Sequence, residues 1–426
     1  MKKRFEKIKK VNGEIILSGD KSISHRAVIF SAMASGKSSI KNISQGEDVQ
    51  STIKIMKQLG AKINFVNNQL IIEGCGYRKF KNPEMDLHCG NSGTSARLIA
   101  GLLAAQKFES TLIGDESLSK RPMKRIIEPL AQMGVKFRMN NDSTLPLTII
   151  PAAEINPINY NMPVASAQVK SCILIAGLHN ESETSVIEKE QTRNHTEKML
   201  GLPVSIIDGK IISSSSGKFY PKPNDYFIPG DISSAAFHIV LTLLTPNSEL
   251  FIKDVSLNPT RIGFINLLKD MGANISFENI RTSSNEDYGD VLVKTSHLKN
   301  IKIDPEIIPN IIDEIPILTI AGIFAEGDFE IENAKELRVK ESDRIKSICY
   351  NLNLLGLKVK EREDGFSISG SIKKIKPIFE SYGDHRIAMS FAILSMILDD
   401  GGEVNNFECV AISNPKFEEQ IHSIIK

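Results

Sequence analysis

Positively charged side chains recur at points where the sequence predicts that a helix begins. The first case is the stretch 19–26, in which Lys21 and Arg26 follow a strand-like run and precede an apolar, small-residue run. The start of a helix carries unpaired backbone N–H groups and the positive end of the helix dipole. With two cationic side chains added, this arrangement suits a phosphate or a carboxylate. A solvated turn with ordinary surface charges would show the same pattern, so this stretch alone does not decide between the two interpretations.

Further reactive residue types stand at later predicted helix starts, and two basic segments, residues 120–125 and 338–344, extend the set. Grouped cations would bind a small polyanion, and carboxylates such as Asp313 and Glu341 could move protons. A single charged run is more often a solvated surface, but these clusters fall at corresponding points of a repeat. The residues at the later helix starts are Ser166, Gln168, Lys170, Asp313, Glu314, His385 and Arg386.

The elements that must position these residues form an internal repeat. An amphipathic helix ending in Leu-Gly or Met-Gly, followed by two strand-like runs, recurs five times at intervals of 67 to 84 residues. Between these helices lie segments rich in small and apolar residues, and helices that are apolar all round are usually buried. Each begins with a residue that can cap a helix, Asp313 in the fifth. The apolar helices are expected at 22–35, 92–106, 166–179, 233–245, 313–325 and 384–398.

Of the six apolar helices, only five are matched by an amphipathic helix and its two strand-like runs, so the sixth repeat still needs both. The N-terminal run 5–17 supplies its hairpin and the C-terminal run 416–425 supplies its helix, so both chain ends belong to one domain. We therefore predict a mixed α/β (α+β) protein with two domains of three repeats each. The predicted boundaries are 19–231 for one domain and 1–18 plus 232–426 for the other, with hinges near 18–20 and 229–231.

Composition and charge narrow the function classes. The 426 residues are 41% hydrophobic and 24% charged, with a net charge of +1, so nothing favours nucleic acid or a membrane surface as a partner. The five cysteines are scattered without a C-x-x-C pair, which favours buried thiols in a reducing cytosol. We find no His, Cys, Asp and Glu spacing typical of a metal site, no signal peptide and no apolar run long enough to span a membrane. The stretch Gly36-Lys37-Ser38 is similar to the end of a P-loop but lacks its first glycine.

A set of motifs is shared with one known family, at residues 19–26, 90–94, 121–123, 166–171, 229–235, 336–344 and 384–386. Through these motifs the chain resembles, almost from end to end, the 5-enolpyruvylshikimate-3-phosphate synthases (3-phosphoshikimate 1-carboxyvinyltransferases). This resemblance implies the enolpyruvyl transferase fold, an inside-out α/β barrel arrangement in which two domains of three repeats enclose the active site in a cleft. It also implies a monomeric cytoplasmic enzyme without a cofactor, which is the target of the herbicide glyphosate.

The family transfers the enolpyruvyl group of phosphoenolpyruvate to the 5-hydroxyl of shikimate 3-phosphate by addition and elimination of phosphate, a step toward chorismate and the aromatic amino acids. The resemblance implies that Asp313 takes the hydroxyl proton, that Glu341 protonates the methylene carbon, and that Lys21 reaches both substrates. The residues implied at shikimate 3-phosphate are Lys21, Ser22, Arg26, Ser166, Ala167, Gln168, Arg193, Asp313 and Lys340. Those implied at phosphoenolpyruvate are Lys21, Gly93, Arg121, Gln168, Arg344 and Arg386.

Two other functions compete with this interpretation. An enzyme of the same fold acts on a UDP-sugar and uses a cysteine in the loop before its Arg-Pro, but the loop 114–120 contains no cysteine. A noncatalytic anion-binding or scaffold protein would have lost a carboxylate or an arginine of the site, and none is lost. The chain departs from the family at Ile412, where many members carry a lysine, and Lys416 is not assigned that role. Residues 166–168 are similar to the second sequence class, some members of which resist glyphosate, although Gly93 is retained.

Overall fold

The computed structural model describes residues 1–140, 142–373 and 376–425. Its contacts divide the chain into two compact units. The expected boundary lay at residue 231, whereas the contacts place Pro229 in unit 1 and give the short segment 282–286 to unit 2. Unit 1 comprises Met1–Ser18, Pro229–Arg281 and Asp287–Lys426, and unit 2 comprises Gly19–Ile228 and Thr282–Glu286.

Unit 2 repeats one pattern of helix and sheet three times. Its helices are α1 (Lys21–Met33), α2 (Glu47–Gln58), α3 (Gly93–Leu103), α4 (Lys124–Gln132), α5 (Ala167–Gly177) and α6 (His195–Leu200), with short 3-10 helices η1 (Leu118–Lys120) and η2 (Gly217–Phe219). Its strands are β3 (Ser35–Lys41), β4 (Lys62–Val66), β5 (Gln69–Cys75), β6 (Leu87–His88), β7 (Ser110–Ile113), β8 (Lys136–Met139), β9 (Leu147–Ile150), β10 (Asn159–Asn161), β11 (Thr184–Glu188), β12 (Val204–Ile207), β13 (Lys210–Ser215) and β14 (Asp225–Phe227).

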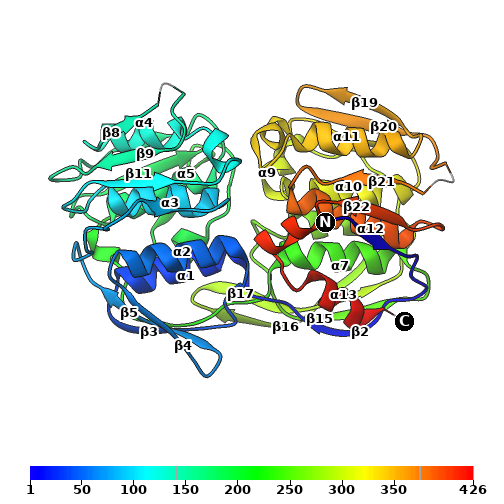
Figure 1. Ribbon diagram of the computed structural model, residues 1–426, viewed down its shortest axis with the longest axis horizontal. Coiled ribbons are helices and arrows are strands. Elements are labelled where there is room, and N and C mark those ends of the chain that lie inside the picture. The colour runs from blue at the N-terminus through cyan, green and yellow to red at the C-terminus, as the bar shows by residue number, and fades with distance from the viewer. Residues whose placement is uncertain (141, 374–375, 426) are drawn as a thin grey trace. The chain divides into compact units, whose positions relative to one another are not determined.

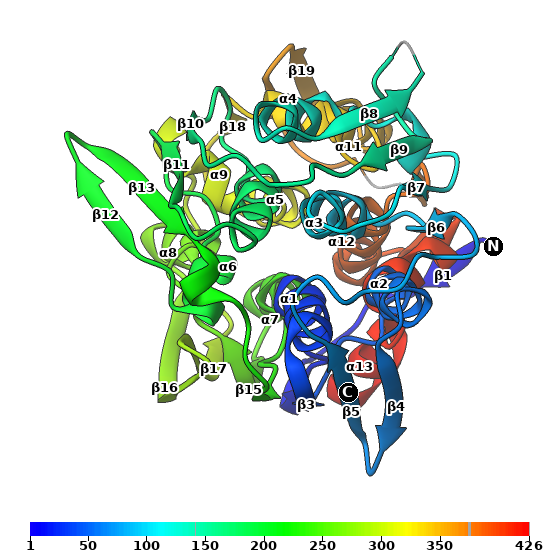
Figure 2. The same cartoon turned by 90° about the vertical axis from the view of Figure 1, so that its left-hand side faces the viewer.

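The three sheets of unit 2 share one topology. Their strand orders are β14-β3-β5-β4, β6-β7-β9-β8 and β10-β11-β13-β12. In each sheet the first strand runs parallel to its neighbour, and the following pairs are antiparallel. Figure 2 shows α1, α3 and α5 end on, with these sheets outside them. The predicted repeat is therefore present, with a buried helix inside and a sheet outside in each copy.

Unit 1 carries the other three repeats and both ends of the described chain (Figure 1). Its helices are α7 (Ile232–Leu244), α8 (Gly263–Asp270), α9 (Ile308–Ile311), α10 (Ile315–Phe324), α11 (Arg344–Leu354), α12 (His385–Ile397) and α13 (Phe417–Ile424), with η3 (Pro305–Ile307), η4 (Lys335–Val339) and η5 (Phe407–Ile412). Its strands are β1 (Lys3–Phe5), β2 (Asn12–Ile16), β15 (Glu249–Ser256), β16 (Asn274–Ser283), β17 (Glu286–Lys294), β18 (Phe329–Ile331), β19 (Lys358–Arg362), β20 (Gly365–Ser369), β21 (Ile378–Glu380) and β22 (Gly402–Asn405).

The sheets of unit 1 join distant parts of the chain. Their orders are β16-β17-β15-β2, β18-β20-β19 and β1-β22-β21. Strand β1 pairs antiparallel with β22, and β2 runs parallel to β15, so the N-terminal hairpin completes sheets built by the second half of the chain. The segment 282–286, which is grouped with unit 2, comprises the turn between β16 and β17 and the adjoining ends of both strands.

The buried helices form the centre of each unit. In α1 every residue from Ile23 to Met33 is buried, and α3, α5, α7, α10 and α12 are buried along most of their length. Small residues allow close packing: a Cβ on Gly101 of α3 would lie 2.2 Å from the Cys172 carbonyl oxygen of α5. Apolar side chains on all sides of these helices explain their burial, and each unit has its own hydrophobic cluster.

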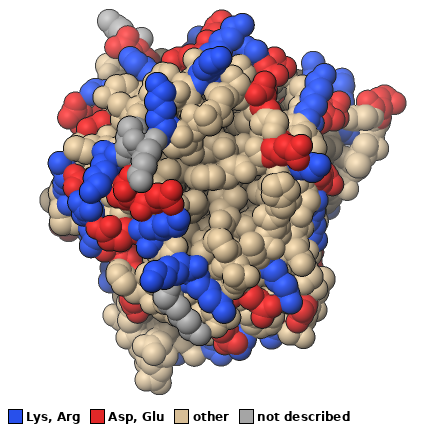
Figure 3. Space-filling model, turned by 90° about the vertical axis from the view of Figure 1, so that its right-hand side faces the viewer, with Lys and Arg blue, Asp and Glu red and all other residues tan. Residues whose placement is uncertain are grey.

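On the face of the molecule drawn in Figure 3, acidic and basic residues lie next to one another around a central area with few charges. This agrees with a net charge of +1. Among the described residues, no single helix is long and apolar enough to cross a membrane. The helices Pro305–Ile311 and Ile315–Phe324 reach the required length and hydropathy only when taken together, and they are bent by 117° at the break between them.

Candidate functional site

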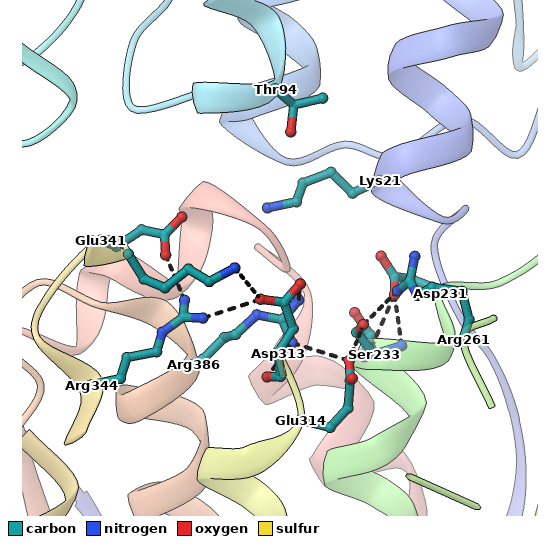
Figure 4. A network of polar contacts seen from close by, with 12 residues as sticks. Lys21, Thr94, Asp231, Ser233, Arg261, Asp313, Glu314, Glu341, Arg344 and Arg386 are labelled. Atoms are coloured by element: carbon teal, nitrogen blue, oxygen red, sulfur yellow. Dashed lines mark hydrogen bonds and ion pairs between the residues drawn. The ribbon is translucent and has the colours of Figure 1, made fainter. Parts of the chain in front are cut away.

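In unit 1, Asp313 lies among three cationic side chains. Its Oδ1 atom is 3.3 Å from both Lys340 Nζ and Arg344 Nη1, and its Oδ2 atom is 3.8 Å from Arg386 Nη2. Figure 4 shows the side chains of Arg344 and Arg386 directed toward this carboxylate. A carboxylate held by fixed cations can accept a proton from a bound hydroxyl group, and the cations can hold an anion beside it.

The sequence placed Asp313 at the cap of the fifth apolar helix, and this expectation was wrong. The N-cap of α10 is Glu314, and among the described residues its side chain makes no capping hydrogen bond with the helix. Pro316 occupies the first turn, where its missing N–H costs little. The Asp313 side chain is therefore not engaged in capping and contacts the cations instead.

Arg344, the first residue of α11, is almost fully buried and bound by carboxylates. Its Nη2 atom is 2.6 Å from Glu341 Oε2, and its Nε atom donates to Asp384 Oδ2 at 2.7 Å. Burial alone would lower the pKa of Arg344, but Asp384, Glu341 and Asp313 outweigh it and raise the pKa above its ordinary value. The guanidinium therefore remains charged and fixes the position of Glu341.

Asp384 organises the start of α12. It caps this helix by accepting a hydrogen bond from the Arg386 backbone N–H at 2.9 Å, while it also binds Arg344. Burial would raise the pKa of Asp384, but the neighbouring Arg344 lowers it below its ordinary value. One buried carboxylate thus connects the two arginines of the site.

In unit 2, the start of α1 places Lys21, Ser22 and Arg26 together. Asp20 caps the helix by accepting from the Ile23 N–H at 2.9 Å. Lys21 Nζ lies 3.0 Å from Asp48 Oδ2, and Arg26 Nη1 donates to the Ser22 carbonyl oxygen at 2.9 Å. Asp48 was not among the residues predicted from the sequence, because no spacing or motif connects it with Lys21.

Arg26 is held inside unit 2 by hydroxyl groups. Its Nε donates to Thr196 Oγ1 at 2.8 Å and its Nη2 to Ser171 Oγ at 2.7 Å. Burial lowers the pKa of Arg26 to about 10, and nearby carboxylates, Glu197 and Glu286 among them, limit the shift. Arg193 also acts electrostatically on Arg26, so two predicted phosphate-binding cations share this region.

A second group in unit 2 surrounds the start of α3. Gln168 accepts from Arg97 Nη1 at 2.5 Å and donates to Thr94 Oγ1 at 3.0 Å. A Cβ on Gly93 would lie 2.9 Å from Arg97 Nη1 and 3.2 Å from Arg121 Cζ. The structure therefore brings together Gly93, Arg121 and Gln168, which stand far apart in the sequence. Arg97 was missed, although its position one helical turn after Gly93 was a usable signal.

Not every charged residue of the candidate set is available to a ligand. Lys170 is buried between Glu188 and Glu197, with its Nζ atom 2.6 Å and 2.7 Å from their carboxylate oxygens. In the basic segment 120–125, Lys120 and Lys124 are exposed and pair with glutamates four residues away, Glu116 and Glu128. Only Arg121 of these three is buried.

Ser166 and Ala167 lie where the sequence predicted, at the start of α5, and Ser166 Oγ accepts from the Val169 N–H at 3.4 Å. His195, just after Arg193, is buried and lies 2.7 Å from Glu286 Oε1. In the part of the chain that the structure describes, no group of three or more His, Cys, Asp or Glu side chains is arranged to hold a metal ion.

Comparison with known proteins places the chain in one family. A family model described as EPSP synthase (3-phosphoshikimate 1-carboxyvinyltransferase) matches residues 5–421. The 3-phosphoshikimate 1-carboxyvinyltransferase of Petrotoga mobilis is 48% identical over 421 residues, which cover 97% of each chain. That of Syntrophomonas wolfei is 44% identical over 428 residues and covers 100% of each chain.

Solved structures agree with these matches. The EPSP synthase of Acinetobacter baumannii is 39% identical, with a TM-score of 0.86, over 100% of this chain and 98% of that chain. The enolpyruvyl transferase NikO of Streptomyces tendae has a TM-score of 0.76 at 14% identity over 100% of this chain and 97% of that chain, a likeness of fold alone.

Proposed function

The chain belongs to the EPSP synthase family, and on this premise we propose that unit 1 supplies the proton-transfer residues, Asp313 and Glu341. The enzyme transfers the enolpyruvyl group of phosphoenolpyruvate to the 5-hydroxyl of shikimate 3-phosphate and releases phosphate, within the shikimate pathway. Both substrates are small polyanions. Fixed cations therefore serve to bind them and to stabilise charge that develops during transfer.

Asp313 acts as the base that takes the proton from the attacking 5-hydroxyl. The observation that carries this assignment is the position of its carboxylate among Lys340, Arg344 and Arg386, at 3.3 to 3.8 Å. The same cations that attract an anionic substrate would bring its hydroxyl group to the base. Asp313 also contributes to the binding of shikimate 3-phosphate.

Glu341 delivers a proton to the methylene carbon of phosphoenolpyruvate, because addition across a carbon–carbon double bond requires an acid at the carbon. Its ion pair with Arg344, 2.6 Å long, fixes the carboxyl group close to an anion-binding arginine. In the elimination step the transfer reverses, and a C–H proton leaves as phosphate departs. Lys21 assists catalysis by contacting both substrates.

The remaining side chains bind the two anions. Arginine pairs with carboxylate and phosphate through two parallel N–H groups, and hydroxyl and amide groups complete the contacts. The residues proposed for shikimate 3-phosphate are Lys21, Ser22, Arg26, Ser166, Ala167, Gln168, Arg193, Asp313 and Lys340. Those proposed for phosphoenolpyruvate are Lys21, Gly93, Arg121, Gln168, Arg344 and Arg386.

The assignment of Asp313 is tested by Asp313→Asn, which keeps the size of the side chain and removes the base. Phosphate release from phosphoenolpyruvate and shikimate 3-phosphate should slow by about 10²-fold or more, while calorimetry shows that shikimate 3-phosphate still binds. Asp328→Asn, an exposed position, is the control. Near wild-type turnover in Asp313→Asn would remove this residue from the proton transfer. A UDP-sugar should give no phosphate release with any variant.

We also propose that the enzyme acts as a monomer in the cytoplasm. All five cysteines are free thiols in the described chain, as is usual in a reducing compartment. Light scattering coupled to size-exclusion chromatography should give the mass of a single chain, and a mass twice as large would refute the monomer.

A further inference from the structure

Glu314 is a buried carboxylate that has no role in the reaction as proposed above. It precedes α10 directly, and only 1% of its side chain is exposed. Its Oε1 atom accepts a hydrogen bond from Ser233 Oγ and lies 3.4 Å from Arg386 Nη1, while its Oε2 atom has no hydrogen-bond partner among the described residues. A carboxylate is costly to bury unless a charged partner compensates it. Arg386 is the cation in contact with it.

The hydrogen bonds of the Arg386 guanidinium group are confined to its Nη1 end, and only a longer ion pair with Asp313 reaches Nη2. Nη1 donates to the Asp313 carbonyl oxygen at 2.8 Å and faces Glu314 Oε1. Within the described residues, Nε and Nη2 make no hydrogen bond, and Nη2 lies 3.8 Å from Asp313 Oδ2. Arginine binds carboxylate and phosphate through two parallel N–H groups. The two acceptors at residues 313 and 314 therefore hold one end of Arg386 and leave the Nε–Nη2 edge for an anion.

Glu314 is itself held from the side of α7. Ser233 Oγ donates to Glu314 and accepts from Arg261 Nη2 at 2.6 Å, and the Ser233 backbone N–H donates to the Asp231 side chain at 2.8 Å. Arg261 is 2% exposed, so this support is internal to the unit. Figure 4 shows the series from Arg261 through Ser233 and Glu314 to Arg386. A carboxylate supported in this way can fix the direction of a guanidinium group.

We propose that Glu314 is a positioning residue, which orients Arg386 so that its Nε–Nη2 edge receives an anionic group of phosphoenolpyruvate. This inference rests on the proposed function, in which Arg386 binds phosphoenolpyruvate. It implies a selective effect: loss of the Glu314 charge weakens the binding of phosphoenolpyruvate and leaves the binding of shikimate 3-phosphate and the rate of proton transfer unaffected. A merely structural residue would not distinguish one substrate from the other.

The test is Glu314→Gln, which keeps the volume and the oxygen that accepts from Ser233 but removes the charge. KM for phosphoenolpyruvate should rise about tenfold, as loss of a charge-assisted hydrogen bond predicts. KM for shikimate 3-phosphate and kcat should stay within about twofold of wild type. Glu326→Gln, at an exposed ion pair with Lys299 beyond the other end of α10, is the matched control and should leave every constant unchanged.

A double-mutant cycle with Arg386→Lys separates this inference from the proposed function. If Glu314 acts through Arg386, Glu314→Gln adds little to KM for phosphoenolpyruvate once Arg386 is lysine. The positioning role would be overturned if the two substitutions raised KM for phosphoenolpyruvate by independent factors that multiply in the double variant, or if Glu314→Gln lowered kcat at unchanged KM. An unchanged KM in Arg386→Lys alone would instead overturn the assignment of Arg386.

Ser233→Ala removes the hydrogen bond that supports Glu314 and should raise KM for phosphoenolpyruvate by a smaller factor than Glu314→Gln does. An unchanged KM in Ser233→Ala would count against the proposal even if Glu314→Gln did not fold.

Discussion

Replacing Lys170 by Met should destabilise the protein strongly, because it removes the ammonium group that pairs with two buried carboxylates. Lys170 Nζ lies 2.6 Å from Glu188 and 2.7 Å from Glu197, and all three side chains are at most 3% exposed. Burial alone would lower the pKa of Lys170, but the two glutamates raise it above its ordinary value. The ion pairs therefore contribute fully at neutral pH, below the lysine pKa of the unfolded chain, and are lost only as alkaline pH deprotonates the folded lysine.

The expected magnitude follows from this geometry. Removing one partner of a buried ion pair costs about 3–5 kcal/mol, and here a single ammonium serves two carboxylates. For a unit of this size the loss corresponds to a fall in Tm of roughly 10 °C.

Chemical denaturation at neutral pH measures this loss of stability. Lys62→Met is the matched control in the same unit, because Lys62 forms an exposed pair with Glu73 and should cost at most about 0.5 kcal/mol. The triple variant Lys170→Met, Glu188→Gln, Glu197→Gln should recover most of the loss. A cost below about 1 kcal/mol at neutral pH would refute the electrostatic reasoning.

Three further outcomes are expected. Gly93→Ala should raise KM for phosphoenolpyruvate by roughly tenfold, because its methyl group would lie 2.9 Å from Arg97 Nη1, whereas Gly217→Ala, with no atom closer than 3.4 Å, should not. Burial lowers the pKa of His238 to about 4, so below pH 6.5 the unfolded chain binds more protons than the folded chain, and the free energy of unfolding should fall by on the order of 3 kcal/mol toward pH 4. The variant His238→Gln should flatten this pH dependence in denaturation experiments. An unaltered slope would exclude His238 as its source. Glu341→Gln should lower kcat by about 10²-fold with substrate binding retained, and in deuterated buffer it should slow deuterium entry into the methylene group of the product.

Much of the fold follows from local sequence. Hydrophobic periodicity and helix-ending glycines recur with each repeat, so the alternation of buried and amphipathic helices could be predicted before any contact was known. The helix starts that carry Lys21, Ser166 and Arg386 were also identifiable, because capping residues and the switch from polar to apolar composition mark them. These signals depend only on residues within a few positions of one another.

The contacts within the site depend on tertiary packing. Residue spacing does not reveal that Asp313 meets Lys340 and Arg344, nor that Lys170 points into the core between two glutamates. Sequence also assigned Asp313 to a helix cap, whereas α10 begins two residues later. Spacing along a helix determines which face a side chain occupies, but the partner on that face comes from a different helix, strand or loop. Only the packing of these elements against one another decides which charges meet.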